Sequence, residues 1–363
     1  MFALAGVAWG RQLVAFKSSS GARPGQCSPE QDRNLHVARY SEPFVFLRVQ
    51  RQRAPSSTPM LATFAPTLFV FLWSTGFVVA RAIAPYADPN LFLLARFAGT
   101  AALFTIVALA MRAPWPRGRE IGKHLFAGAL LQGVYLGAGY WAVAQGLSAG
   151  VMALLGALQP LLTAAIAART FGERLPPRRW TGMSLGLAGV VLVLSPKLYA
   201  VMHAGGGAIA DAAAATPHMH AHANPLLVVV VAVVSVGSIT AGTLYQKTSL
   251  AQADIRSASA VQNLGAAIVA AVLALVLGET RWIATPTLWF SLAWGIAMLS
   301  GAGVTLLVWM VRHGDAARAT ALLFLAPPLA ALESWLLFGE TLTPMQMAGF
   351  GVALAGVLLA RRA

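Results

Sequence analysis

Long apolar runs recur from residue 61 to the end of the chain, and each is close to twenty residues long. A helix rises about 1.5 Å per residue, so about twenty residues cross the roughly 30 Å of hydrocarbon in a bilayer. Because a backbone inside lipid must satisfy its own hydrogen bonds, each run is predicted to be a transmembrane helix. The predicted spans are residues 61–83, 90–111, 124–146, 150–169, 180–196, 225–247, 257–278, 287–311, 319–338 and 345–360.

The composition agrees with a membrane protein and excludes a soluble domain. Hydrophobic residues make up 58% of the chain and charged residues only 10%, whereas soluble domains are about 25% charged. The formal net charge of +14 could point to nucleic acid. Most Lys and Arg residues, however, lie in short connections between apolar runs, where they act as orientation signals. We therefore expect a lipid bilayer and no nucleic acid as the surroundings of this chain.

Lys and Arg residues are distributed unevenly between the two sides of this ten-helix arrangement. One side has three of them, Arg81, Lys197 and Arg281. The other side has fourteen: Arg112, Arg117, Arg119, Lys123, Arg169, Arg174, Arg178, Arg179, Lys247, Arg256, Arg312, Arg318, Arg361 and Arg362. The positive-inside rule places the richer side, and with it both chain termini, in the cytoplasm.

The chain also repeats itself after 166 or 167 residues. Phe171–Leu175 reads FGERL and Phe338–Leu342 reads FGETL. Further pairs in this register are Gly76 with Gly242, Asp88 with Asp254, Gly99 with Gly265, Pro177 with Pro344, Gly182 with Gly349, and Gly189 with Gly356. Each unit has five predicted helices, an odd number, so the second unit enters the membrane from the opposite side. Inverted repeats are typical of alternating-access transporters, whose site lies between the halves near the midplane.

At this point the chain resembles a known family. FLWSTGFVVAR in the first span, LLARF in the second, GLSAGVMALLGALQPLLTA into the fourth and the two FGE segments are similar to the paired EamA domains of the drug/metabolite transporter superfamily. The resemblance covers roughly residues 61 to 361. It implies an all-α integral membrane fold of two inverted five-helix repeats. It also implies export or exchange of small metabolites, often amino acids or related compounds, across a bacterial inner membrane.

Four regions follow from these patterns. Residues 1–59 form a basic extension that is predicted to be disordered, or to be an over-extended translation start with Met60 as the true initiator. The single cysteine of the chain, Cys27, lies in this extension, so no intrachain disulfide is expected. Residues 60–197 and 224–363 are the two repeats. Residues 198–223 form an external loop rich in Ala, Gly and His. Its alternating His218, His220 and His222 could bind zinc or copper, but a solvated linker is the favoured interpretation and no metal site is predicted.

Two charged residues lie inside the predicted spans away from their ends, and buried charges in lipid are candidates for function. Arg96 either snorkels to the interface in a structural role or has a role in substrate contact or gating. Its counterpart in the repeat is Gln262, followed by Asn263, so one half would supply charge and the other amide groups. Glu333 corresponds to the apolar Ile166. It is either a site for a substrate ammonium or a proton, or a carboxylate that reaches the outer interface or pairs with a neighbouring polar group.

Glu173 and Glu340 repeat faithfully, but both precede a helix, where an acid favours the positive end of the helix dipole. We expect a structural role or a gate-bracing role for them, on opposite faces of the membrane.

Pro160 and Pro327, next to Gln159 and Pro328 respectively, lie mid-span and are predicted to interrupt their helices at a cavity wall. Further candidate cavity residues are Trp73, Ser74, Gln132, Tyr135, Tyr140, Trp141, Tyr245 and Trp309. For Trp282 and Trp289, near the ends of spans, an interfacial aromatic belt is the favoured interpretation.

The sequence therefore predicts a secondary transporter of a small-molecule substrate, working by alternating access without a cofactor. The spans contain no metal cluster or nucleophile and base at catalytic spacing, so an enzyme is not expected. Multidrug or cationic-compound efflux, metal efflux, and a non-transport membrane scaffold or sensor are alternatives. A homodimer is one oligomeric state that the sequence allows.

Overall fold

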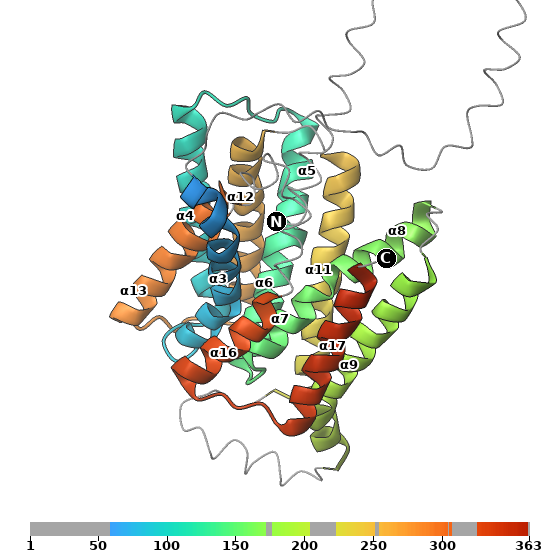
Figure 1. Cartoon of the computed structure of the whole chain (residues 1–363). Coiled ribbons are helices and arrows are strands. Elements are labelled where there is room, and N and C mark those ends of the chain that lie inside the picture. The colour runs from blue at the N-terminus through green and yellow to red at the C-terminus, as the bar shows by residue number, and fades with distance from the viewer. Residues whose placement is uncertain are drawn as a thin grey trace, which may run out of the picture.

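The computed structural model describes residues 59–171, 176–203, 223–250, 254–303, 305–306 and 325–361. The regular elements of these residues are helices, and a β-bridge pairs Ala87 with Trp282. The expectation of an all-helical fold is confirmed for this part of the chain. Figure 1 shows the helices packed as one bundle, with α9 and α17 side by side at one edge.

The helices divide into two sets that follow the sequence repeat. The first half consists of α3 (Pro59–Ile83), α4 (Pro89–Ala110), α5 (Arg119–Gly128), η2 (Ala129–Val134), α6 (Tyr135–Ala144), α7 (Ala149–Ala157), α8 (Gln159–Phe171) and α9 (Pro177–His203). The second half consists of α11 (Pro225–Ser249), α12 (Ile255–Val276), α13 (Pro286–Ala293), η3 (Trp294–Ala302), α16 (Ala326–Phe338) and α17 (Pro344–Arg361).

Three helices of the described residues are long and apolar enough to cross a membrane by themselves: Pro89–Ala110, Pro225–Gln246 and Ile255–Val276. Shorter apolar helices cover Thr67–Ile83, Ala149–Thr163, Trp180–Ser195 and Pro344–Leu359. Apolar helices in a bundle of this kind indicate a membrane protein. The count of ten membrane-crossing helices stays a prediction.

Two helices contain π-helical turns that the sequence does not signal. In the region of the predicted span 124–146, η2 joins α5 to α6 in one continuous helix that ends at Ala144, and η3 continues α13 in the second half. A π-helix widens the turn, and such segments often mark functional sites. Both segments contribute side chains to the central cavity described below.

The predicted interruption at Pro160 coincides with a helix boundary. α7 ends at Ala157, and α8 starts at Gln159 with Pro160 as its second residue. Proline is tolerated there because the first N–H groups of a helix have no partner within it. Pro327 likewise lies in the first turn of α16.

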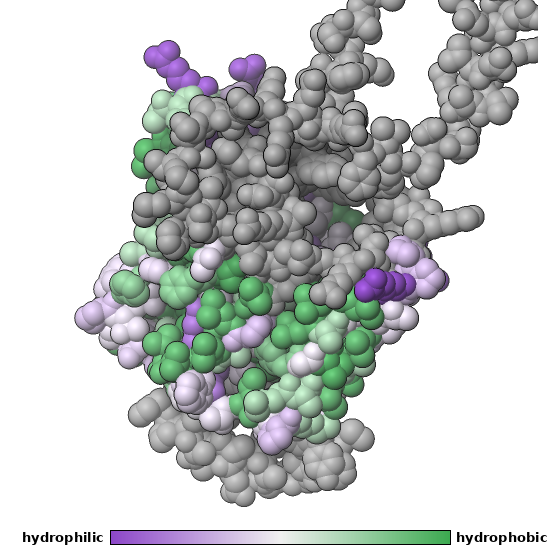
Figure 2. Space-filling model, viewed as in Figure 1, coloured by the Kyte–Doolittle hydropathy of each residue, from purple (hydrophilic) through white to green (hydrophobic). Residues whose placement is uncertain are grey.

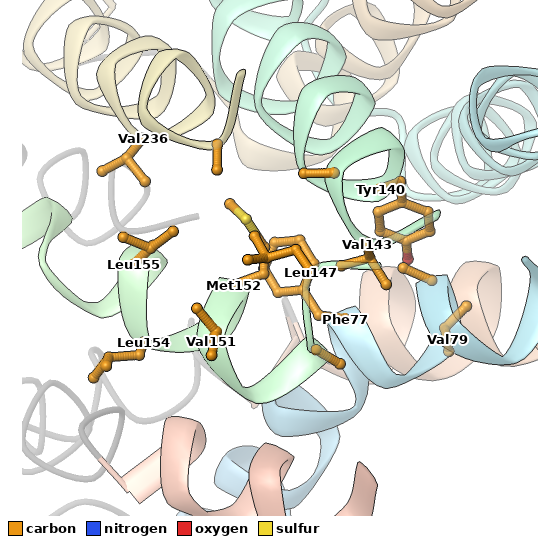
Figure 3. Packing of buried hydrophobic residues seen from close by; sticks show 14 of the residues in the cluster. Phe77, Val79, Tyr140, Val143, Leu147, Val151, Met152, Leu154, Leu155 and Val236 are labelled. Atoms are coloured by element: carbon orange, nitrogen blue, oxygen red, sulfur yellow. The ribbon is translucent and has the colours of Figure 1, made fainter. Parts of the chain in front are cut away.

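The core joins the two halves. Phe77 of α3, Met152 of α7 and Val236 of α11 belong to one buried cluster (Figure 3). Other large apolar side chains are exposed, such as Val233, Leu275 and Leu336. Figure 2 shows apolar residues over much of the surface formed by α16 and α17. An outward-facing apolar surface is what contact with lipid requires.

The first helices of the two halves meet one end of the bundle in opposite senses. α3 ends there and is followed by the connection to α4. α11 begins at the same end, where the backbone N–H of Ala223 donates to Oε1 of Gln145 at 3.0 Å, directly after α6. In Figure 1, α3 runs down toward the end from which α11 rises.

Candidate functional site

A cavity of about 160 Å³ lies between the two halves. Cavities for drug-sized ligands are typically roughly 300 to 1,000 Å³, so this one suits a smaller molecule. The first half lines it with Trp73, Gly76, Phe77, Arg96, Phe104, Leu131, Gln132, Tyr135, Leu136, Ala153, Gly156 and Ala157. The second half lines it with Ile239, Ser259, Gln262, Asn263, Leu299, Ser300, Ala326 and Pro327.

Arg96 is the charged residue of this lining, and it is 7% exposed. Its Nη1 donates to the Tyr140 hydroxyl at 2.9 Å, and that hydroxyl donates to the Gly76 carbonyl oxygen at 2.8 Å. Gly295 of η3 makes room for the arginine, because a Cβ there would lie 3.0 Å from Arg96 Cδ and Nε. The guanidinium is thus held between α3, α6 and η3.

Amide groups of α12 face the same space. Gln262 and Asn263 are 4% and 3% exposed. The Asn263 Nδ2 donates to the Ser259 carbonyl oxygen at 2.8 Å, while its Oδ1 has no partner. The Gln262 Nε2 lies 3.4 Å from Nδ1 of the buried His124. In the repeat register Gln262 corresponds to Arg96, and both line the cavity.

Aromatic rings and π-helical residues complete the cavity wall. Trp73 and Phe77 come from α3, and Tyr135 follows η2, which supplies Gln132. Gly156 allows the Tyr135 hydroxyl to approach, since a Cβ there would lie 2.9 Å from it. The wall is mostly apolar with a few polar groups, as in most small-molecule sites.

Several candidate residues lie elsewhere. Ser74 donates to Oε1 of Glu333 at 2.6 Å, and the Glu333 Oε2 has no partner. Gln159 is buried and donates to Thr243 at 3.0 Å, joining α8 to α11. None of these residues is part of the cavity lining of the described chain.

The remaining aromatic candidates also face other surroundings. Tyr140 is outside the cavity lining and contacts the lining residues Gly76, Phe77 and Arg96. Tyr245 packs edge-on against Phe126, with ring centroids 5.1 Å apart. Trp141 lines a second cavity, and Pro160 is absent from the lining of the central one. Glu173, Trp309 and the three alternating histidines lie outside the described residues. Within the described part of the chain, no group of three or more His, Cys, Asp or Glu residues could hold a metal ion.

Glu340 forms an ion pair that the sequence did not predict. Its Oε1 lies 2.7 Å from the Arg81 Nε, and the Arg81 guanidinium lies over the Phe338 ring at 5.5 Å. Arg81 belongs to the first half, and Glu340 to the second. The pair lies beside the α3 to α4 connection.

The same end of the bundle carries further links between the halves. Oδ2 of Asp88 accepts from the backbone N–H groups of Thr280 and Arg281, and Oδ1 lies 3.4 Å from the Arg281 Nε. We call the end of the bundle that holds Asp88, Glu279, Arg281 and Glu340 the closed end. In the sequence, Asp88 stood out only because it repeats as Asp254. The spacing of residues around Asp88 does not indicate that it pairs with Arg281.

Glu279 caps the first turn of α4 from the other half. Its Oε2 accepts from the backbone N–H groups of Asn90 and Leu91 at 2.8 and 3.0 Å, and its Oε1 accepts from the Asn90 Nδ2 at 2.7 Å. Burial raises the pKa of the Glu279 carboxyl above its usual range, and these hydrogen bonds lower it by less. Glu279, Arg281, Asp88 and Trp141 line a second cavity of about 320 Å³. The only sequence signal for this cluster is an acid beside Arg281 in a predicted external connection.

Comparison with known proteins extends this picture. Residues 60–195 and 226–362 each match the model of the EamA-like transporter family. The chain is 25% identical over 294 residues to the "Uncharacterized inner membrane transporter YedA" of Escherichia coli (strain K12), covering 80% of this chain and 87% of that protein. The same protein from Escherichia coli O157:H7 matches equally. A solved structure described only as "Crystal structure of protein" matches with a TM-score of 0.53 at 19% identity, over 83% of this chain and 97% of the other, which supports the fold. The two family matches cover most of the chain, which therefore belongs to the EamA-like transporter family.

Proposed function

We propose that this protein is a secondary transporter that exports small metabolites, such as amino acids or related amphipathic compounds, across the bacterial inner membrane. Membership of the EamA-like transporter family supports transport in general. The observation that carries the proposal is the cavity between the halves, to which the register partners Arg96 and Gln262 both contribute. A site at the interface of repeats is what alternating access requires.

The proposed topology has ten transmembrane helices in two inverted repeats, with both termini in the cytoplasm. The inversion is supported by α3 ending where α11 begins. The cytoplasmic termini are supported by the Lys and Arg distribution in the sequence. In this arrangement the closed end faces the periplasm.

The proposed mechanism is a rocking of one half against the other. The closed end is held by the Arg81–Glu340 and Asp88–Arg281 ion pairs, each with one partner from each half. Opening this end would break both pairs and expose the cavity to the opposite side. Export would be driven by the substrate gradient, by exchange or by proton coupling, for which Glu333 is the candidate.

Other functions are weaker alternatives. Efflux of cationic compounds would favour an acid in the cavity, yet within the described residues the charged lining residue is Arg96. Metal efflux would rest on the histidines of residues 198–223, which lie outside the described residues. A membrane scaffold would not need a cavity between the halves.

The test is metabolite profiling of cells that overexpress the protein, comparing medium with cytoplasm. A defined class of compounds moving into the medium is expected. The variant Ala157→Phe should abolish this, because Ala157 lines the cavity and the ring would fill it. Ala102→Phe is the matched control, since Ala102 is exposed on α4. Equal export by the two variants would contradict the central cavity as the route.

A further inference from the structure

Arg96 is a buried cation without an acidic partner in the part of the chain that the structure describes. No Asp or Glu of the described residues lies within ion-pair distance of its guanidinium, and none of them lines the cavity. Its hydrogen-bond partner is the neutral Tyr140 hydroxyl, and its buried Nε has no partner at all. A buried charge is stabilised by an opposite charge or by strong hydrogen bonds. The cavity therefore has one positive charge that a ligand can neutralise.

The surroundings hold this charge in a fixed place. The chain of hydrogen bonds from Arg96 through Tyr140 to the Gly76 carbonyl oxygen ties the guanidinium to α3 and α6. The missing side chain at Gly295 lets the arginine lie along η3. A guanidinium held in this way keeps a planar set of donors that matches a carboxylate.

Among the described residues, the opposite wall of the cavity carries no charged group that could pair with Arg96. The polar groups there are the amides of Gln262 and Asn263 with the hydroxyls of Ser259 and Ser300. The buried Asn263 Oδ1 has no donor, so a ligand hydroxyl or neutral N–H group would satisfy it. A ligand ammonium would meet no carboxylate on this wall within the described residues.

We propose that the cavity binds a small monocarboxylate of net charge −1, with its carboxylate on Arg96, its hydrogen-bond donor on Asn263 and its apolar body against Trp73 and Phe77. This inference rests on the proposed transport function and narrows its substrate class from amphipathic metabolites in general to organic anions. The 160 Å³ volume restricts the ligand to a small molecule. Tyr140 is a positioning residue, because it lies outside the cavity lining and holds the Arg96 guanidinium by a hydrogen bond.

The test measures binding to the purified full chain by calorimetry and thermal unfolding, without transport. The probes share one isobutyl frame and differ in charge: 2-hydroxy-4-methylpentanoate, 4-methylpentanoate, leucine and 3-methylbutylamine. A phenyl series with 3-phenyllactate, 3-phenylpropionate, phenylalanine and phenethylamine repeats the comparison. The hydroxy acid should bind most tightly in at least one series, and the amine least tightly in both.

Variants assign the effect to Arg96. Arg96→Gln should weaken carboxylate binding by about tenfold to a hundredfold, as expected for loss of a charged hydrogen bond. Arg96→Lys should recover part of the affinity because it keeps the charge, and Tyr140→Phe should cost less than Arg96→Gln. Arg119→Gln is the control, since it removes an exposed arginine at the start of α5 that does not line the cavity. If Arg96→Gln does not fold, the affinities of Tyr140→Phe and the ranking of the charged probes on the wild-type protein still test whether a carboxylate binds at Arg96.

Three results would overturn the inference. The first is tighter binding of the amine or the amino acid than of the hydroxy acid. The second is an unchanged carboxylate affinity in both Arg96→Gln and Tyr140→Phe. The third is the absence of carboxylate binding in both series of probes. Failure of transport is a separate outcome. A chain that binds carboxylates through Arg96 but moves none of them in proteoliposome counterflow would retain this inference and contradict the proposed function.

Discussion

Arg81 and Glu340 connect the two halves of the bundle through an ion pair of 2.7 Å. Two helical turns earlier, Ser74 donates to Glu333 at 2.6 Å. Both pairs are separated by 259 residues, so the end of α3 and α16 run in the same direction. The first pair lies near the closed end, and the second lies deeper along the same interface.

Neutralising Glu340 should favour opening of the closed end. The pair is partly exposed, at 24% and 19% of the two side chains, and such pairs contribute about 0.2 to 1 kcal/mol. Glu340→Gln should therefore shift the population toward the open state by up to about fivefold. The measurement is the rate at which a maleimide labels Ala144→Cys, which lines the second cavity, in a Cys27→Ser background.

The charge-reversed pair is the control for this experiment. Arg81→Glu combined with Glu340→Arg should restore the slow labelling rate, whereas either change alone should accelerate it. Equal labelling rates in all variants would mean that the pair does not hold the closed end.

Glu333→Gln should remove any dependence of transport on a pH gradient. Glu333 has one oxygen bonded to Ser74 and the other without a partner, so a proton can be accommodated on this carboxyl. Transport in proteoliposomes with and without an imposed pH gradient provides the measurement. Ser74→Ala is the control, because it removes the hydrogen bond and keeps the titratable group. Persistence of the pH-gradient effect in Glu333→Gln would exclude this residue as the coupling site.

Gly349→Ala should destabilise the fold, and Gly351→Ala should not. A Cβ on Gly349 would lie 2.8 Å from the Gly189 carbonyl oxygen and 2.8 Å from the Val193 backbone nitrogen, whereas a Cβ on Gly351 would meet nothing within 4 Å. Overpacking of this kind costs about 1 to 3 kcal/mol. Thermal unfolding in detergent compares the two variants, which lie on the same helix, α17. Equal stability of the two would show that α9 and α17 do not pack as closely as described.

The Glu279 carboxyl should make stability depend on pH. Burial raises its pKa in the folded chain, above the value of about 4.3 that an exposed Glu has. The folded state then binds more protons than the unfolded state, so the free energy of unfolding falls as pH rises from about 4.3 through the raised pKa. Thermal unfolding from about pH 4.5 to 8 should show this fall in the wild type and a smaller one in Glu279→Gln. If the unfolding temperatures of the wild type and Glu279→Gln changed with pH in the same way, Glu279 would not be the source of the pH dependence.

The candidate site could be predicted in part. The intramembrane charge at Arg96 and the amides in its repeat partner segment stood out because polar groups are rare in apolar runs. The structure places Trp73, Arg96, Gln132, Gln262, Asn263 and Pro327 around one cavity. Their role in binding remains a prediction. Gln159 and Tyr245 were predicted as cavity residues on the same grounds. In the structure, Gln159 donates to Thr243 and Tyr245 packs against Phe126, outside the cavity lining.

The sequence could not separate the residues that line the cavity from those that do not, because of how helices pack within lipid. A soluble helix shows its inner face by an apolar stripe, but here lipid and protein interior are both apolar, so periodicity does not tell which side of α3 or α7 faces the cavity. The rotation of each helix follows from close contacts such as that of Gly295 with Arg96, and no residue spacing encodes them. The π-helical segments η2 and η3 were missed for a similar reason, since no residue type signals the extra residue in the turn.

The sequence by itself determined the membrane environment, the internal repeat and the helical class, because apolar run length and the repetition of FGE segments are properties of the chain alone. Only the tertiary structure decided which polar groups meet. Arg81 with Glu340, Asp88 with Arg281, and Glu279 with the first turn of α4 lie far apart in sequence and pair across the two halves. Such pairs depend on the relative position of the halves, which is fixed by packing and not by local propensity.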